Sequence, residues 1–84
     1  MEYRLLVDIE VLDFMATLKP AQRKNLLAQF RRIQDYPGYH AEYVEHDHIG
    51  RRIDVCIFEG FAIHYWEDAA DRHVKILLVL PADG

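Results

Sequence analysis

The chain has 84 residues, of which 51% are hydrophobic and 29% are charged, and its formal net charge is −4. This length allows one small domain, and the acidic balance disfavours a protein whose whole surface binds nucleic acid. The longest apolar run, Ile76 to Leu80, is too short to cross a bilayer, and the single cysteine, Cys56, cannot form an internal disulfide. We therefore expect a soluble protein with no membrane partner, and the lack of a recognisable signal peptide predicts a cytoplasmic one.

The first half of the chain predicts one strand followed by two helices. Apolar residues alternate with polar ones at the start, which predicts a strand over roughly residues 2–9. Helical spacing follows in Val11, Leu12, Met15 and Leu18. Pro20 then begins a second helix, because proline is tolerated in the first turn of a helix but not in its interior. We expect this helix to end near Tyr36-Pro37-Gly38.

After Gly38 the hydrophobic pattern changes to a period of two, which is typical of strands. It predicts a short strand over residues 42–48, a hairpin of residues 51–58 and 61–67, and a last strand over residues 74–80. The last strand is nearly all apolar, which predicts burial on both faces and a central position in the sheet. The fold class is therefore α+β: an N-terminal strand, a two-helix hairpin, then three or four antiparallel strands, with the helices on one sheet face.

The two-residue loop Glu59-Gly60 predicts the register of the central hairpin. Phe58 pairs with Phe61 in this register, so the side chains opposite one another include Cys56–Ile63, Asp54–Tyr65, Ile57–Ala62, Val55–His64 and Ile53–Trp66. At the open end the same register places Arg52 opposite Glu67 and Arg51 opposite Asp68. Opposite charges across a strand pair are mildly stabilising, so we expect these two ion pairs to form.

Both faces of this hairpin are apolar, although the helix pair can cover only one of them. We expect the second face to expose a patch that binds a partner, formed by Ile53, Val55, Ile57 and Trp66. The alternative is that residues 42–48, the chain ends or a second copy of the protein cover this face.

Charge is unevenly distributed along the chain. Five cations and one acid lie between Lys19 and Asp35, whereas two cations and eight acids lie between Glu42 and Asp71. This predicts a basic helical side and an acidic sheet side. The basic residues of the second helix are candidates for binding nucleic acid or an acidic partner: Arg23, Lys24, Arg31 and Arg32. A solvated helix face is the alternative reading.

The element order, and the run RRIDVCIFEGFAIHYWED followed by RHVKILLVL, resemble the RelE/ParE superfamily of bacterial toxins from toxin-antitoxin modules. The resemblance spans nearly the whole chain, and Tyr65 lies where the central hairpin of that family often has tyrosine. It implies a single domain over residues 1–84, in which a curved sheet packs against two helices, and a cognate antitoxin that wraps the toxin. It also implies one of two activities, ribosome-dependent messenger RNA cleavage or inhibition of DNA gyrase.

RNA cleavage through the 2′-hydroxyl requires a base, an acid and a cation that stabilises the developing phosphorane charge. The candidates for these catalytic roles are Arg51, Arg52, His46, His48 and His64, with Glu45 as a further base. No spacing among them is diagnostic of an active site. The ribosome and its messenger RNA, or gyrase, would then be the cellular target.

Several positions depart from the pattern of the family. Where its hairpin typically carries arginines, this chain has Val55, Ile57 and Ala62. The alternative function is therefore a catalytically inactive binding module, or a homodimer formed through the same sheet face. His46 and His48 are two apart on a predicted strand, but the sequence identifies no third ligand for zinc. We accordingly assign no metal and no cofactor from the sequence.

Overall fold

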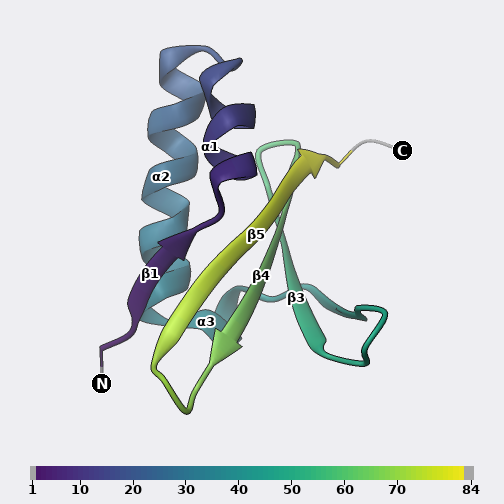
Figure 1. The fold of residues 1–84 in the computed structure, drawn as a ribbon. Coiled ribbons are helices and arrows are strands. Elements are labelled where there is room, and N and C mark those ends of the chain that lie inside the picture. The colour runs from purple at the N-terminus through teal and green to yellow at the C-terminus, as the bar shows by residue number, and fades with distance from the viewer. Residues whose placement is uncertain (1, 83–84) are drawn as a thin grey trace.

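The computed structural model describes residues 2–82, which form an α+β fold (Figure 1). Its elements in chain order are β1 (Arg4–Val7), α1 (Ile9–Ala16), α2 (Pro20–Asp35), α3 (Pro37–His40), β2 (Tyr43–His46), β3 (Arg52–Phe58), β4 (Phe61–Asp68) and β5 (His73–Pro81). The predicted fold class is confirmed. Within the described residues, no helix is both long enough and apolar enough to cross a membrane.

The five strands form one sheet in the order β1-β5-β4-β3-β2. β1 is parallel to β5, and the other neighbouring strands are antiparallel. The first strand is shorter than the sequence predicts. Asp8 ends it by capping α1, since its side chain accepts a hydrogen bond from the backbone N–H of Glu10 at 2.9 Å.

The hairpin of β3 and β4 has the predicted register over the five residue pairs from Asp54–Tyr65 to Phe58–Phe61. The turn contains two residues with positive φ, Glu59 at 49° and Gly60 at 84°. This is the backbone of a two-residue hairpin turn, which matches the right-handed twist of the flanking strands. The side chain of Asn25 in α2 donates a hydrogen bond to Glu59 at 3.1 Å, so the turn also contacts the helix layer.

Helices α1 and α2 lie on one side of the sheet (Figure 1). Pro20 begins α2 as predicted, and the backbone N–H of Lys19 donates to Gln22 Oε1 at 3.0 Å. A single core joins the helices to the sheet, and its buried members are Val11, Met15, Leu26, Phe30, Ile33, Cys56, Ile63, Tyr65, Val74, Ile76 and Val79. The helical spacing in the sequence is confirmed in part: Val11 and Met15 of α1 are buried, whereas Leu12 is 48% exposed and Leu18 lies beyond the end of α1 at Ala16.

Strand β5 lies between β1 and β4, as predicted, but its two faces are not equally buried. Val74, Ile76 and Val79 face the helices and are fully or almost fully buried, whereas Leu78 and Leu80 are 41% and 44% exposed. The expectation that β5 is buried on both faces is wrong, because the described helices cover only one side of the sheet. A β-bulge at His64/Tyr65 shifts the pairing of β4 with β5 at this point.

The short helix α3 connects α2 to β2, the strand at one edge of the sheet. The sequence predicts an end to α2 here but not this separate turn of helix. The hydroxyl of Tyr65 donates a hydrogen bond to the Pro37 carbonyl at 2.5 Å, and the tyrosine is fully buried. Burial is the main cause that raises the pKa of Tyr65, with the nearby carboxyl of Asp54 adding to it. The phenol is thus a neutral donor that fixes α3 to the sheet.

We predict that Tyr65→Phe lowers the free energy of unfolding by about 1–3 kcal/mol, because a buried carbonyl loses its donor. The measurement is urea unfolding at neutral pH. The folded-state pKa of Tyr65 is raised, so its contribution is fully present below the ordinary tyrosine pKa of about 10 and is lost as the pH rises above it. Wild type should therefore lose more stability in alkali than Tyr65→Phe. Equal losses in both proteins would contradict this role.

Candidate functional site

The face of the sheet opposite the helices carries most of the candidate residues. The strand registers place side chains of four strands in one row across it: Tyr43, Val55, His64 and Leu78. A second row joins Ile57, Ala62 and Leu80. We refer to this surface as the outer sheet face.

A cavity of about 200 Å³ opens on the outer sheet face at the end where β2 turns into β3. Its lining is Glu45, His46, Asp47, Arg51, Ile53, His64, Leu77 and Leu78. Four of the residues that the sequence singles out for catalysis therefore meet here: His46, His64, Arg51 and Glu45. The floor is apolar, so charged groups in the cavity are only partly screened by water.

His64 lies at the centre of this arrangement. Its side chain is only 14% exposed, and its Nε2 lies 3.5 Å from Oε1 of Glu45. Nδ1 of the same ring is buried and has no hydrogen-bond partner among residues 2–82. A buried polar atom without a partner costs free energy, so an orphan of this kind calls for an explanation such as a ligand or an ordered water.

Arg51 is held at the rim of the cavity by two contacts. Its Nε donates to Oδ2 of Asp47 at 2.9 Å, and its guanidinium carbon lies 4.6 Å from the centre of the Trp66 ring. Hydrogen bonds from the backbone of Arg51 and Ile49 lower the pKa of Asp47 despite the opposing effect of burial. Asp47 is thus a stable anion that orients the arginine.

The predicted ion pairs across the open end of the hairpin do not form. Arg51 pairs with Asp47 rather than Asp68, and Arg52 donates to Asp54 Oδ1 at 3.0 Å rather than to Glu67. Glu67 instead accepts a hydrogen bond from the Tyr3 hydroxyl at 2.6 Å. The prediction is wrong because acids on the same strand or in the adjacent turn are nearer than those across the hairpin.

Two catalytic candidates lie away from the cavity. Arg52 alternates to the opposite side of β3 from Ile53, and 66% of its side chain is exposed. His48 lies in the turn after β2, which ends at His46, so the two histidines do not share a strand face as predicted. The Asp47 carboxylate shapes this turn by accepting hydrogen bonds from the backbone N–H groups of Ile49 and Arg51.

The predicted partner-binding patch is only partly accessible. Ile53 and Val55 are 7% and 0% exposed, whereas Ile57 and Trp66 are half-buried. The expectation that Ile53 and Val55 are exposed is wrong, because β2 pairs with β3 and Tyr43 and Glu45 flank them. Cover from residues 42–48 was one of the alternative readings, and it holds for Ile53 and Val55 but not for the rest of this face. The exposed apolar residues on this face are Tyr43, Leu78 and Leu80, which the sequence analysis missed.

The basic residues of α2 lie in the helix layer, on the other side of the sheet from the cavity. Lys24, Arg31 and Arg32 are exposed. Arg23 is half-buried and donates to the Leu18 carbonyl at 2.6 Å, so it also stabilises the connection between the helices. Whether these cations bind nucleic acid stays a prediction.

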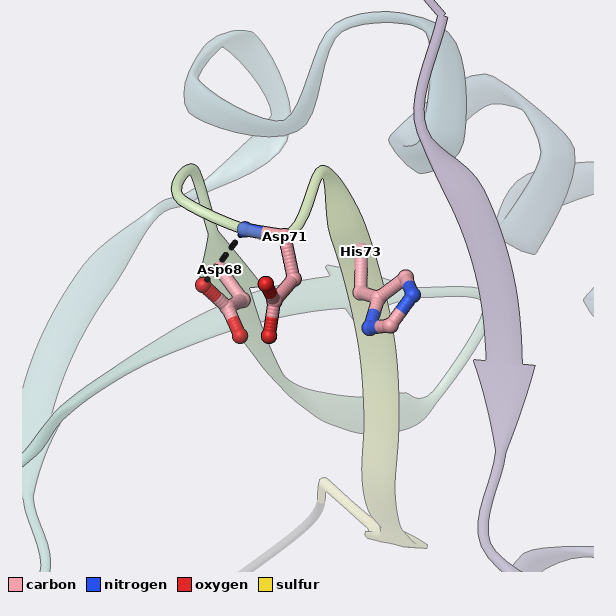
Figure 2. Close-up of side chains that lie close together, drawn as sticks. All are labelled: Asp68, Asp71 and His73. Carbon is pink, nitrogen blue, oxygen red and sulfur yellow. Dashed lines mark hydrogen bonds between the residues drawn. The ribbon is translucent and has the colours of Figure 1, made fainter.

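A second cluster of chemically active side chains lies at the turn between β4 and β5 (Figure 2). The ligand atoms of Asp68, Asp71 and His73 all lie within 4.8 Å of one another. The backbone N–H of Asp71 donates to Oδ1 of Asp68 at 3.2 Å. Carboxylate and imidazole groups can ligate a metal ion. None of these three residues is a metal-ligand candidate from the sequence, although the spacing D-x-x-D-x-H is a signal for such a set.

The fold of this chain is similar to that of two solved RelE structures. One match is a chain in the crystal structure of the archaeal RelE-RelB complex from Pyrococcus horikoshii OT3. The match covers 98% of this chain and 97% of that chain, with a TM-score of 0.77 and 22% sequence identity. A double arginine-to-alanine mutant of E. coli toxin RelE in the free state matches over 99% of this chain and 86% of its own, with a TM-score of 0.73 and 16% identity. The chain therefore has a RelE-like fold. Neither a protein-family model nor a curated protein sequence matches it.

We predict that Arg51→Ala increases quenching of the single tryptophan, Trp66, by acrylamide, because the guanidinium no longer covers one side of the ring. The cost in stability should stay below about 1 kcal/mol, since the pair is partly exposed. Tryptophan fluorescence measures both effects. Arg31→Ala, on α2, is the matched control and should leave the quenching unchanged. Unchanged quenching in Arg51→Ala would contradict the contact.

Proposed function

We propose that this protein is the toxin of a bacterial type II toxin-antitoxin system, that a cognate antitoxin neutralises it, and that it acts in the cytoplasm on translation by cleaving messenger RNA at the ribosome. The observation that supports this most is the match of nearly the full chain to RelE chains. One of those neighbours is a complex with RelB, and the other is named a toxin.

The cavity on the outer sheet face supplies groups suited to this reaction. In RNA cleavage the 2′-oxygen forms a bond to phosphorus while the bond from phosphorus to the 5′-oxygen breaks. One group removes the proton of the 2′-hydroxyl, and another protonates the leaving 5′-oxygen. We assign the first role to His64, which Glu45 orients, and the second to His46. Arg51, fixed by Asp47, supplies positive charge for the phosphorane.

The exposed apolar residues beside the cavity support an antitoxin-binding role for the same face. Leu78 and Leu80 on β5 and Tyr43 on β2 are all more than one third exposed. Ile57 and Trp66 are half-buried, so the predicted patch keeps two of its four members at least partly accessible. An antitoxin segment bound across this face would cover the cavity and exclude the RNA.

A second candidate function uses the same surface without catalysis. The arginines expected on the hairpin are replaced by Val55, Ile57 and Ala62, and leucines are exposed in their vicinity. These features favour a non-catalytic binding module or a homodimer. The two functions differ in whether the polar groups of the cavity are needed for any activity.

Induction of this protein alone in a bacterial host tests the proposed activity. We expect growth arrest with a rapid fall in total protein synthesis, measured by incorporation of a labelled amino acid. Because His64 and Arg51 line the cavity and His48 does not, the double variant His64→Ala/Arg51→Ala should grow normally. His48→Ala, at equal expression, should arrest growth like wild type.

Two results would overturn the assignment. Arrest with altered DNA supercoiling and intact translation would indicate gyrase as the target. Normal growth with well-folded wild type at high expression would favour the binding module. Circular dichroism of the purified double variant distinguishes a lost activity from a lost fold.

The role of the exposed leucines has its own test. We predict that Leu78→Asp/Leu80→Asp weakens binding to a co-expressed antitoxin, or self-association, at least about tenfold, because a charge on each side chain must be desolvated on binding. Leu27→Asp on α2 is the matched control, since Leu27 is 47% exposed and lies in the helix layer. Calorimetry and sedimentation measure the two equilibria. Equal weakening by both variants would place the interface elsewhere.

A further inference from the structure

The turn between β4 and β5 brings three metal-ligating side chains together through the backbone itself. Asp68 and His73 are directly opposite in the register of the two strands. Asp71 lies in the connecting turn, and its N–H bond to Asp68 keeps its own side chain beside that carboxylate. Figure 2 shows the two carboxylates next to each other, with the His73 ring beside them.

The histidine distinguishes this cluster from a pair of solvated aspartates. Two carboxylates alone match the oxygen ligands of calcium or magnesium and are common on protein surfaces without either ion. A neutral imidazole adds a nitrogen donor, and mixed nitrogen and oxygen ligands are typical of zinc and neighbouring transition metals. The cluster thus has the composition of a three-ligand zinc site.

The charges of the two aspartates are not balanced by an ion pair. No pair within 4.0 Å among residues 2–82 includes Asp68 or Asp71. Two carboxylates less than 5 Å apart repel each other even in water. A divalent cation between them would turn this repulsion into attraction.

We propose that Asp68, Asp71 and His73 form a binding site for a divalent cation of the zinc class. Ligands about 2.0–2.2 Å from a tetrahedral zinc ion lie about 3.4 Å from one another. The present spacing is up to 4.8 Å, so the side chains would have to rotate to reach that value. Asp71 is exposed, which leaves its side chain room to do so. Three protein ligands leave a fourth position for water. None of the three residues lines the cavity, so the site does not depend on the proposed function.

The experiment uses the full chain, purified with EDTA, dialysed and titrated with zinc chloride alone in a calorimeter. We expect one zinc ion per chain and a rise in the melting temperature when zinc is present, because the ion binds only the folded turn. Asp71→Asn and His73→Gln should each weaken zinc binding at least about tenfold, because each removes a direct ligand. Loss of an outer-shell partner, which does not touch the metal, already weakens binding by roughly 10- to 100-fold. Circular dichroism without metal verifies that both variants fold.

The control variants make the same types of substitution at positions outside the proposed site. His48→Gln and Asp13→Asn, both at exposed positions, should bind zinc like wild type. Cobalt provides a second readout, since its visible spectrum reports direct ligation by His73 and should change in His73→Gln.

Three outcomes would overturn the site. The first is that wild type binds no zinc up to about 1 mM, which is the weak end of protein metal affinities. The second is that Asp71→Asn and His73→Gln bind zinc with unchanged affinity. The third is that His48→Gln loses zinc binding. The last result would assign the metal to His48 in the turn after β2 instead.

Discussion

Because side chains alternate between the two faces of a strand, the register that the Glu59-Gly60 turn imposes on β3 and β4 decides which residues meet the helices. In the observed register Ile63 and Tyr65 are buried against α1 and α2, whereas His64 and Trp66 face outward. A slip of one residue would exchange these sets. It would break the bond from Tyr65 to Pro37 and place an imidazole in the apolar core. The hairpin register therefore determines the core, the position of α3 and the cavity together.

The outer sheet face is a candidate functional surface that has a shallow cavity and no deep cleft among the described residues. Here the sheet has a helix layer on one side only, and short side chains such as Val55 are covered by larger ones on neighbouring strands. Polar groups gather at the margin of this apolar surface, where Asp47 and Trp66 fix Arg51 from two directions. An arginine held in this way loses little further side-chain entropy when it meets an anion.

Local patterns in the sequence predict much of this fold, and contacts distant in sequence account for what they miss. The hairpin register, the break at Pro20 and the interior position of β5 follow from turn chemistry, proline geometry and hydrophobic periodicity. The burial of Val55 depends on the pairing of β2 with β3. The ion-pair partner of Arg51 depends on the shape of the turn at Asp47. The spacing of residues in the sequence predicts neither of these contacts. The cavity residues could be nominated by chemical type, but only the fold shows that His48 and Arg52 lie apart from His64.

The parallel pairing of β1 with β5 joins the first and the last of the described strands. During synthesis β1 leaves the ribosome before the other elements of this sheet, yet its partner emerges only when those elements have been made. The closure of this loop carries the largest entropic cost in the sheet, and it comes late. Until then β5 has an open, apolar edge that can pair with other chains. Complete folding, and with it any activity that depends on the complete sheet, therefore waits until nearly the last residue of the sheet has been translated.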